Sequence, residues 1–172
     1  MGPTRVLVAY ASKMGSTAEI AGWIGERLRE RDYAVDVTPV EGVRNVKDYE
    51  TVVIGSAVYM LRWRPEAVRF LKRCAAELTG ANVWVFQSGP IDDSAERKEI
   101  ALPKKVARLT RAVGAHPHVT FGGRLRPDAE GFMASKMARN AAGDHRDRAR
   151  IRGWADEIAD ALSPAPDYTS TG

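Results

Sequence analysis

A single cysteine, Cys74, occurs among the 172 residues of the chain. One cysteine excludes an internal disulfide, so we expect an ordinary apolar core and a reducing compartment. No stretch approaches the roughly 18 consecutive apolar residues of a membrane-spanning helix. The apolar run that ends at Tyr10 is too short for a signal peptide. We therefore expect a cytoplasmic protein.

Neither acidic nor basic residues dominate the composition. Lys and Arg number 26 against 22 Asp and Glu, which leaves a net charge of +4. The sequence shows no helix-turn-helix spacing, zinc-ligand set or aromatic RNA-binding motif, so we expect no nucleic-acid partner. The small excess of positive charge favours anionic partners instead, such as phosphates, carboxylates or an acidic lipid surface.

Short apolar segments alternate with amphipathic ones along the chain. Such alternation predicts a doubly wound α/β fold, in which helices cover both faces of a parallel sheet. We expect one domain over residues 1–162 and a disordered tail over 163–172. The expected strands are Arg5–Tyr10, Tyr33–Val37, Thr51–Gly55, Asn82–Phe86 and Val119–Gly123, and the expected helices are Thr17–Arg31, Pro65–Leu78, one through Val106 to Val113 and one through Ile151 to Leu162.

Three loops follow the carboxyl ends of predicted strands, where ligands bind in open parallel sheets. They are Ala11–Thr17, Ser56–Pro65 and Ser88–Asp93. The first is the most informative, because it is rich in small and hydroxyl residues and a helix follows directly. Unpaired amides at a helix start bind phosphate. The alternative is an ordinary helix capped by Ser16 or Thr17.

The loop has neither the Walker spacing nor the dinucleotide fingerprint. Instead, the segment Val6–Ala21 resembles the opening of the flavodoxin family, with Ser12, Gly15 and Thr17 at matching positions. Met14 stands where that family usually has a hydroxyl residue. The resemblance implies a flavodoxin-like five-stranded parallel sheet of order 2-1-3-4-5 that binds flavin mononucleotide (FMN).

Three further segments are similar to the menaquinone-dependent protoporphyrinogen oxidase branch: Gly55–Tyr59, Phe121–Leu125 and Arg152–Ala159. Carried over by position, the resemblance implies a phosphate site and two segments flanking the flavin ring. The phosphate site would be Ser12, Lys13, Met14, Gly15, Ser16 and Thr17; one face of the ring would meet Ala57, Val58 and Tyr59, and the other Ser88, Gly89 and Pro90.

Aromatic stacking on the ring is expected from Tyr59, with Trp63 as a rival. Because the chemistry belongs to the cofactor, we expect no catalytic side chains. His116, His118 and His145 have no ligand spacing to a carboxylate or to Cys74, so no metal site is expected.

A basic segment over 124–150 interrupts the regular alternation. It carries seven cationic residues interleaved with Phe132, Met133 and Met137. The segment could contact an anionic membrane surface, at the inner face of the cell membrane, or clasp a carboxylated substrate. The alternative is a solvated helical excursion. The cationic residues are Arg124, Arg126, Lys136, Arg139, Arg146, Arg148 and Arg150.

Three functions stay open at this point. The first is an FMN-dependent oxidoreductase of the protoporphyrinogen-oxidase type, which passes electrons from a reduced small-molecule substrate to a quinone. The second is an electron carrier that docks to a redox partner protein. The third is the same fold with a deazaflavin (coenzyme F420) in place of FMN. The basic charge and the extra segment favour an enzyme over a carrier, since carriers of this fold are typically acidic.

Overall fold

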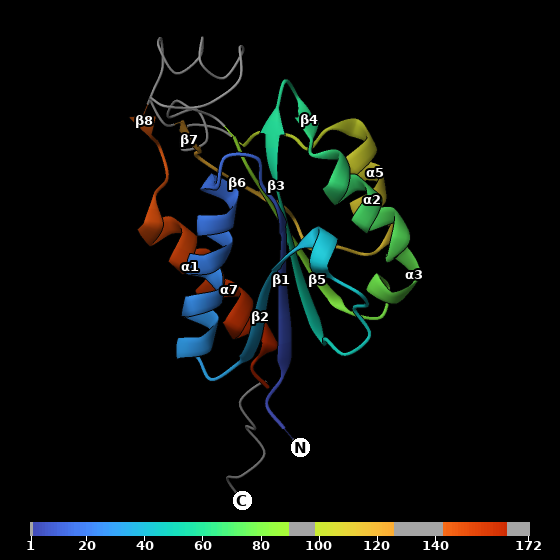
Figure 1. Ribbon diagram of the computed structural model, residues 1–172. Helices are drawn as coiled ribbons and strands as arrows, with labels where there is room; N and C mark the ends of the chain where they lie inside the picture. The colour runs from blue at the N-terminus through green and yellow to red at the C-terminus, as the bar shows by residue number, and fades with distance from the viewer. Residues whose placement is uncertain (1, 90–98, 126–142, 165–172) are drawn as a thin grey trace, which may run out of the picture.

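Five parallel strands form the centre of the computed structural model, which describes residues 2–89, 99–125 and 143–164. Their order across the sheet is β2-β1-β3-β5-β6 (Figure 1). Counted along the chain without β4, this is the predicted order 2-1-3-4-5, so the predicted fold class is confirmed. The strands are β1 (Arg5–Ala11), β2 (Ala34–Pro39), β3 (Thr51–Tyr59), β5 (Asn82–Ser88) and β6 (Val119–Phe121).

Helices cover both faces of the sheet. One face carries α1 (Ser16–Glu30) and α7 (Arg148–Leu162). The other carries α2 (Pro65–Arg73), α3 (Ala75–Leu78) and α5 (Lys104–Ala112), and a short 3-10 turn, η1 (Val40–Gly42), follows β2. Figure 1 shows the two layers on opposite sides of the strands.

Two apolar cores follow from the alternation of side chains along β1. Val6 and Val8 pack against α1 and α7, whereas Leu7 and Ala9 pack into the core on the α2 side. Because both faces of the strand are covered, its sequence is continuously apolar, as in other parallel sheets. On α1, residues at intervals of four form the inner stripe: Ile20, Ile24 and Leu28 are fully buried.

The structure corrects two expected boundaries on the α2 side. The helix expected over Pro65–Leu78 is interrupted at Cys74, whose backbone (φ −98°, ψ 9°) leaves the helical region, so α2 and α3 are separate. The strand expected to end at Gly55 continues to Tyr59, because β4 (Arg62–Trp63) pairs antiparallel with its end. The predicted loop Ser56–Pro65 is therefore largely a β-hairpin.

The basic segment is also different from expectation where it is described. A two-stranded antiparallel ribbon, β7 (Arg124–Leu125) and β8 (Gly143–Asp144), opens and closes it. Helix α7 begins at Arg148, inside the expected 124–150 segment, with Asp147 as N-cap. Residues 126–142, and the expected tail from residue 165 onward, lie outside the described residues. No helix within the described ranges is long and apolar enough to cross a membrane.

Candidate functional site

The start of α1 presents backbone amides without helical partners. Its N-cap is Gly15 in the left-handed conformation (φ 85°), and the first helical bond runs from the Glu19 amide to the Gly15 carbonyl at 3.0 Å. The amides of Ser16, Thr17 and the next residue precede that bond. Partial positive charge therefore gathers at this end of the helix, next to the loop that the sequence singled out.

The hydroxyl groups around this helix start do not cap it. Ser12 Oγ accepts the Gly15 amide at 3.0 Å, and Ser16 Oγ accepts the Arg124 amide at 3.1 Å. Thr17 Oγ1 shares a buried hydrogen bond of 2.8 Å with Ser88 Oγ. The alternative of a helix capped by Ser16 or Thr17 was wrong, because Gly15 occupies the N-cap and places both residues in the first helical turn.

The space beside Gly15 is open. A Cβ built on Gly15 would meet no atom of the described residues within 4 Å. Lys13 is exposed and Met14 is half-buried, so a cation lies on the same short loop as the unpaired amides. Open space, helix amides and a lysine together suit a terminal phosphate or another anionic group.

The second predicted segment, Ala57–Tyr59, lies on the end of β3 rather than in a loop. Tyr59 is 43% exposed, and the turn beyond it, Met60 and Leu61, has positive φ at both residues (49° and 60°). Such a two-residue turn matches the twist of an antiparallel hairpin. Tyr59 therefore stays available to stack on a planar ligand.

Trp63 is not available for stacking, which corrects its proposed rival role. Its side chain is buried, and its Nε1 donates to Gln87 Oε1 at 3.0 Å. Gln87 Nε2 in turn donates to the Ile100 carbonyl at 3.0 Å and to Thr120 Oγ1 at 2.9 Å. This buried network joins the hairpin to β5 and β6.

The third predicted segment meets the second at very short range. A Cβ on Gly89 would lie 2.7 Å from the Val58 carbonyl oxygen, so only glycine permits this approach. Ser88 is buried and pairs in register with Ala57 across β3 and β5. Pro90 lies outside the described residues. The parallel register thus brings the ends of β1, β3 and β5 to one edge of the sheet.

Arginines that the sequence did not assign to this site also reach the helix start. Glu19, in the first turn of α1, accepts Arg124 Nη2 at 3.0 Å and Arg146 Nη1 at 2.6 Å. Arg146 also pairs with Asp144 at 2.7 Å and lies over the Trp23 ring at 4.6 Å. Hydrogen bonds from Arg146 hold the pKa of Asp144 below its ordinary value. No local signal could reveal these contacts, since Glu19 and Arg146 are 127 positions apart.

Comparison with known proteins gives the family. A family model described as a flavodoxin domain matches residues 7–145, which is most of the chain. The chain belongs to the flavodoxin-domain family. No curated protein matches it.

Solved structures agree with this flavodoxin fold. Oxidised flavodoxin 2 from Bacillus cereus is 20% identical, with 92% of this chain and 100% of that chain covered and a TM-score of 0.60. A mutant Fusobacterium nucleatum flavodoxin bound to flavin mononucleotide is 15% identical, with 94% and 99% covered and a TM-score of 0.58. Identities this low show the fold alone.

One similar structure belongs to a longer protein. The rubredoxin oxygen:oxidoreductase of Desulfovibrio gigas is 17% identical, with a TM-score of 0.63 and 94% of this chain covered. The match covers only 37% of that oxidoreductase chain. The shared fold thus makes up only part of that polypeptide.

The described arginines of the basic segment make ion pairs and hydrogen bonds within this flavodoxin domain. Arg148 pairs with Glu26 at 3.4 Å, and Arg150 Nη1 donates to the Thr120 carbonyl at 2.8 Å. With Arg124 and Arg146 held by Glu19, these four make internal contacts. The remaining residues that suggested a membrane or substrate contact, Arg126, Phe132, Met133, Lys136, Met137 and Arg139, lie outside the described residues.

Histidine and cysteine take structural positions. Across the described ranges no three His, Cys, Asp or Glu side chains lie together as a metal site would require. The ring of His116 stacks on Trp84 with centroids 4.0 Å apart, and Cys74 is buried in the core on the α2 side.

Proposed function

We propose that this flavodoxin domain binds FMN at the carboxyl edge of its sheet and transfers electrons through it. The observation that carries the proposal is the start of α1, where unpaired amides and a glycine in the left-handed conformation border open space. A phosphate is the ligand that this arrangement suits best. The FMN-bound F. nucleatum flavodoxin has the same fold, which supports the choice of cofactor.

Each side chain of the edge has a defined task in this proposal. The amides after Gly15 and the hydroxyl of Ser12 would hold the phosphate, and Lys13 would add a positive charge. Ala57–Tyr59 and Ser88–Gly89 would flank the two faces of the ring. The ring itself supplies the electron-transfer chemistry, while the protein sets its surroundings and access to water.

The visible absorption spectrum of the purified protein tests the cofactor. We expect two bands of bound FMN, or their appearance when cofactor-free protein is titrated with FMN. Riboflavin, which lacks the phosphate, should bind more weakly than FMN if the helix start is the phosphate site. Equal affinity for the two would place the anionic group elsewhere, and no binding of either would overturn the proposal.

A deazaflavin such as coenzyme F420 is the second candidate cofactor. Lys13, exposed on the phosphate loop, favours it, because the anionic tail of a deazaflavin extends beyond its phosphodiester. The same titration decides between them, since a deazaflavin gives one shifted absorption band. Tighter binding of F420 than of FMN would replace the first assignment.

The finer proposal is an oxidase of the protoporphyrinogen type that passes electrons to a quinone. Its support is the sequence resemblance at Gly55–Tyr59, Phe121–Leu125 and Arg152–Ala159. The test is oxidation of protoporphyrinogen by the FMN-loaded protein with a menaquinone analogue, against free FMN as control. If the FMN-loaded protein is inactive, the remaining proposal is an electron carrier that a redox partner protein reduces or oxidises.

A further inference from the structure

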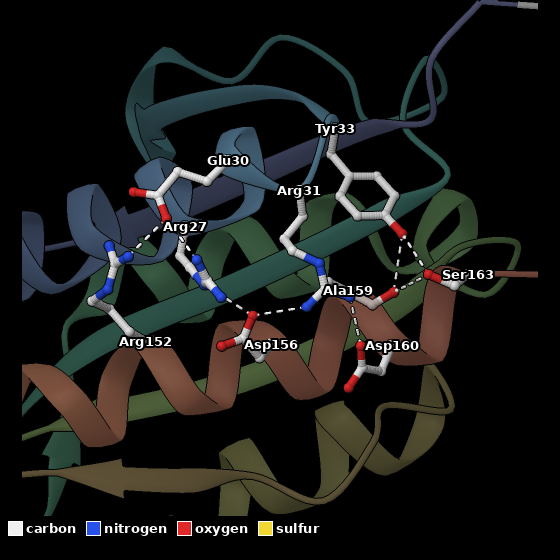
Figure 2. Close-up of polar contacts among 9 residues, drawn as sticks. All are labelled: Arg27, Glu30, Arg31, Tyr33, Arg152, Asp156, Ala159, Asp160 and Ser163. Carbon is white, nitrogen blue, oxygen red and sulfur yellow. Dashed lines mark hydrogen bonds and ion pairs between the residues drawn. The ribbon is translucent and has the colours of Figure 1, made fainter.

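The two helical layers of this domain differ in how their charged side chains are paired. Between α1 and α7, acidic and basic side chains alternate in register (Figure 2). Arg152 pairs with Glu30 at 2.7 Å, and Asp156 accepts both Arg27 at 2.9 Å and Arg31 at 2.8 Å. This layer therefore neutralises its own charge.

Within the described ranges, the opposite layer does not neutralise its charge in this way. Helices α2 and α5 pack beside each other and expose seven basic side chains. We call six of them the basic surface and leave out Arg73, whose guanidinium donates to the Val43 carbonyl. Among the described residues, only Arg69 of this surface has an acidic neighbour, Glu66, at the loose distance of 4.0 Å. The basic surface consists of Arg69, Lys72, Lys104, Lys105, Arg108 and Arg111.

Like charges approach each other closely on the basic surface. The positive charge of Lys72 is the main reason that the pKa of Lys105 lies below its ordinary value, and Arg108 adds to the effect. Uncompensated repulsion of this kind destabilises the folded chain slightly. An anionic partner would remove it.

An apolar turn precedes helix α2 of the basic surface in the chain. Met60 and Leu61, which we call the turn tip, are 72% and 82% exposed. The hairpin leads through β4 directly into α2, the first helix of the basic surface (Figure 1). Arg62, immediately after the tip, is also exposed.

The residue types at the turn tip are unfavourable for its backbone conformation. Positive φ at both central positions of a hairpin turn favours Asn and Gly, and large side chains are strained there. Met60 and Leu61 are also the two most exposed large apolar side chains of the described chain. Neither backbone preference nor core packing accounts for them, which points to a contact made outside the chain.

We propose that the basic surface and the turn tip together bind an anionic membrane surface. Aliphatic side chains at a tip can enter the boundary between lipid headgroups and acyl chains, while lysine and arginine attract lipid phosphates. The positive charges are spread over the exposed sides of two helices. A flat layer of lipid phosphates matches this distribution better than an acidic protein of defined shape.

Sedimentation with lipid vesicles tests the proposal and needs no flavin. We expect the full chain to sediment with vesicles of phosphatidylcholine and phosphatidylglycerol in equal parts, and not with phosphatidylcholine alone. The Lys72→Gln, Lys105→Gln pair should raise the lipid concentration needed for half-binding about thirtyfold. The Arg148→Gln, Arg152→Gln pair removes the same charge from the opposite layer and should leave it nearly unchanged.

The turn tip is tested separately by Met60→Asn with Leu61→Gly. This pair suits the backbone of the turn, so folding should be maintained or improved while vesicle binding weakens severalfold. Absence of vesicle binding, or equal loss in both charge variants, would overturn the proposal. Binding to soluble polyglutamate without binding to vesicles would also overturn it, and would assign the surface to an acidic protein.

Discussion

Thr17, at the start of α1, and Ser88, at the end of β5, share a buried hydrogen bond of 2.8 Å between their hydroxyl groups. This bond joins the proposed phosphate loop to the segment expected at one face of the ring. Replacing either partner leaves the other hydroxyl buried and unpaired.

We expect Thr17→Val and Ser88→Ala each to lower the free energy of unfolding by about 1–3 kcal/mol. The double variant should lose less than the sum, because it leaves no unpaired hydroxyl at this contact. Urea denaturation of the four proteins measures the coupling. Ser12→Ala, which breaks an exposed bond to the Gly15 amide, is the control and should have a smaller effect. Strict additivity would show that the two hydroxyls do not support each other.

The left-handed conformation of Gly15 gives a second prediction. Gly15→Ala should lower the free energy of unfolding by about 1–2 kcal/mol, because a Cβ disfavours φ near 85°. It should also weaken FMN binding, since the added methyl group enters the open space beside the helix start.

Gly22, in the middle of α1, is the matched control for Gly15→Ala. A Cβ there also meets nothing within 4 Å, but its φ is not positive. Gly22→Ala should therefore stabilise the protein by about 0.5–1 kcal/mol, with FMN affinity unchanged. A destabilised Gly22→Ala together with a stable Gly15→Ala would contradict the assignment of the N-cap.

The charge of Glu19 should affect binding of the FMN phosphate rather than binding of the flavin ring. Removing Arg124 by Arg124→Gln leaves Glu19 less compensated at the positive end of α1. We expect the Kd for FMN to rise about two- to fivefold, with the Kd for riboflavin unchanged. Glu19→Gln should shift the FMN affinity in the opposite direction.

Arg148→Gln serves as control for Arg124→Gln, because Arg148 pairs with Glu26 further along α1. Fluorescence titration of each variant with FMN and with riboflavin gives the two constants. Parallel loss of affinity for both flavins would mean that Arg124 acts through the fold and not through the phosphate.

Low pH should lower the free energy of unfolding, because it protonates carboxylates that are paired with arginines in the folded protein. Arginines lower the pKa of Glu30, where Arg152 contributes most, and of Asp156, where Arg27 contributes most. The folded protein therefore binds these protons less readily than the unfolded chain. The stabilisation is complete above the unfolded pKa values, which lie near 4, and it is lost as the pH falls through the lower folded values.

Urea denaturation as a function of pH measures this loss. The free energy of unfolding should decline from about pH 5 downward, and Asp156→Asn should make the decline shallower. Asp48→Asn removes an exposed carboxylate that has no ion pair within the described ranges, and it should leave the slope unchanged. An identical slope in Asp156→Asn and the wild type would refute the contribution of the α1–α7 pairs.

Most of the fold could be predicted because its signals are local. The apolar run at Val6–Tyr10, the four-residue spacing of Ile20, Ile24 and Leu28, and the alternation of strands with helices all lie within short windows. The errors occurred where tertiary pairing overrode local pattern. Pairing with β4 extends β3 to Tyr59, and the helix break at Cys74 has no proline or glycine to mark it.

The sequence alone determined which residue types gather in the loop Ser12–Thr17, because small residues, hydroxyls and a following helix are neighbours along the chain. Only the tertiary structure decided which distant groups join it. Thr17 meets Ser88 across 71 positions, and Glu19 meets Arg146 across 127. Parallel strand register and the packing of α7 beside α1 bring these residues together. Neither can be predicted from a short segment of the sequence.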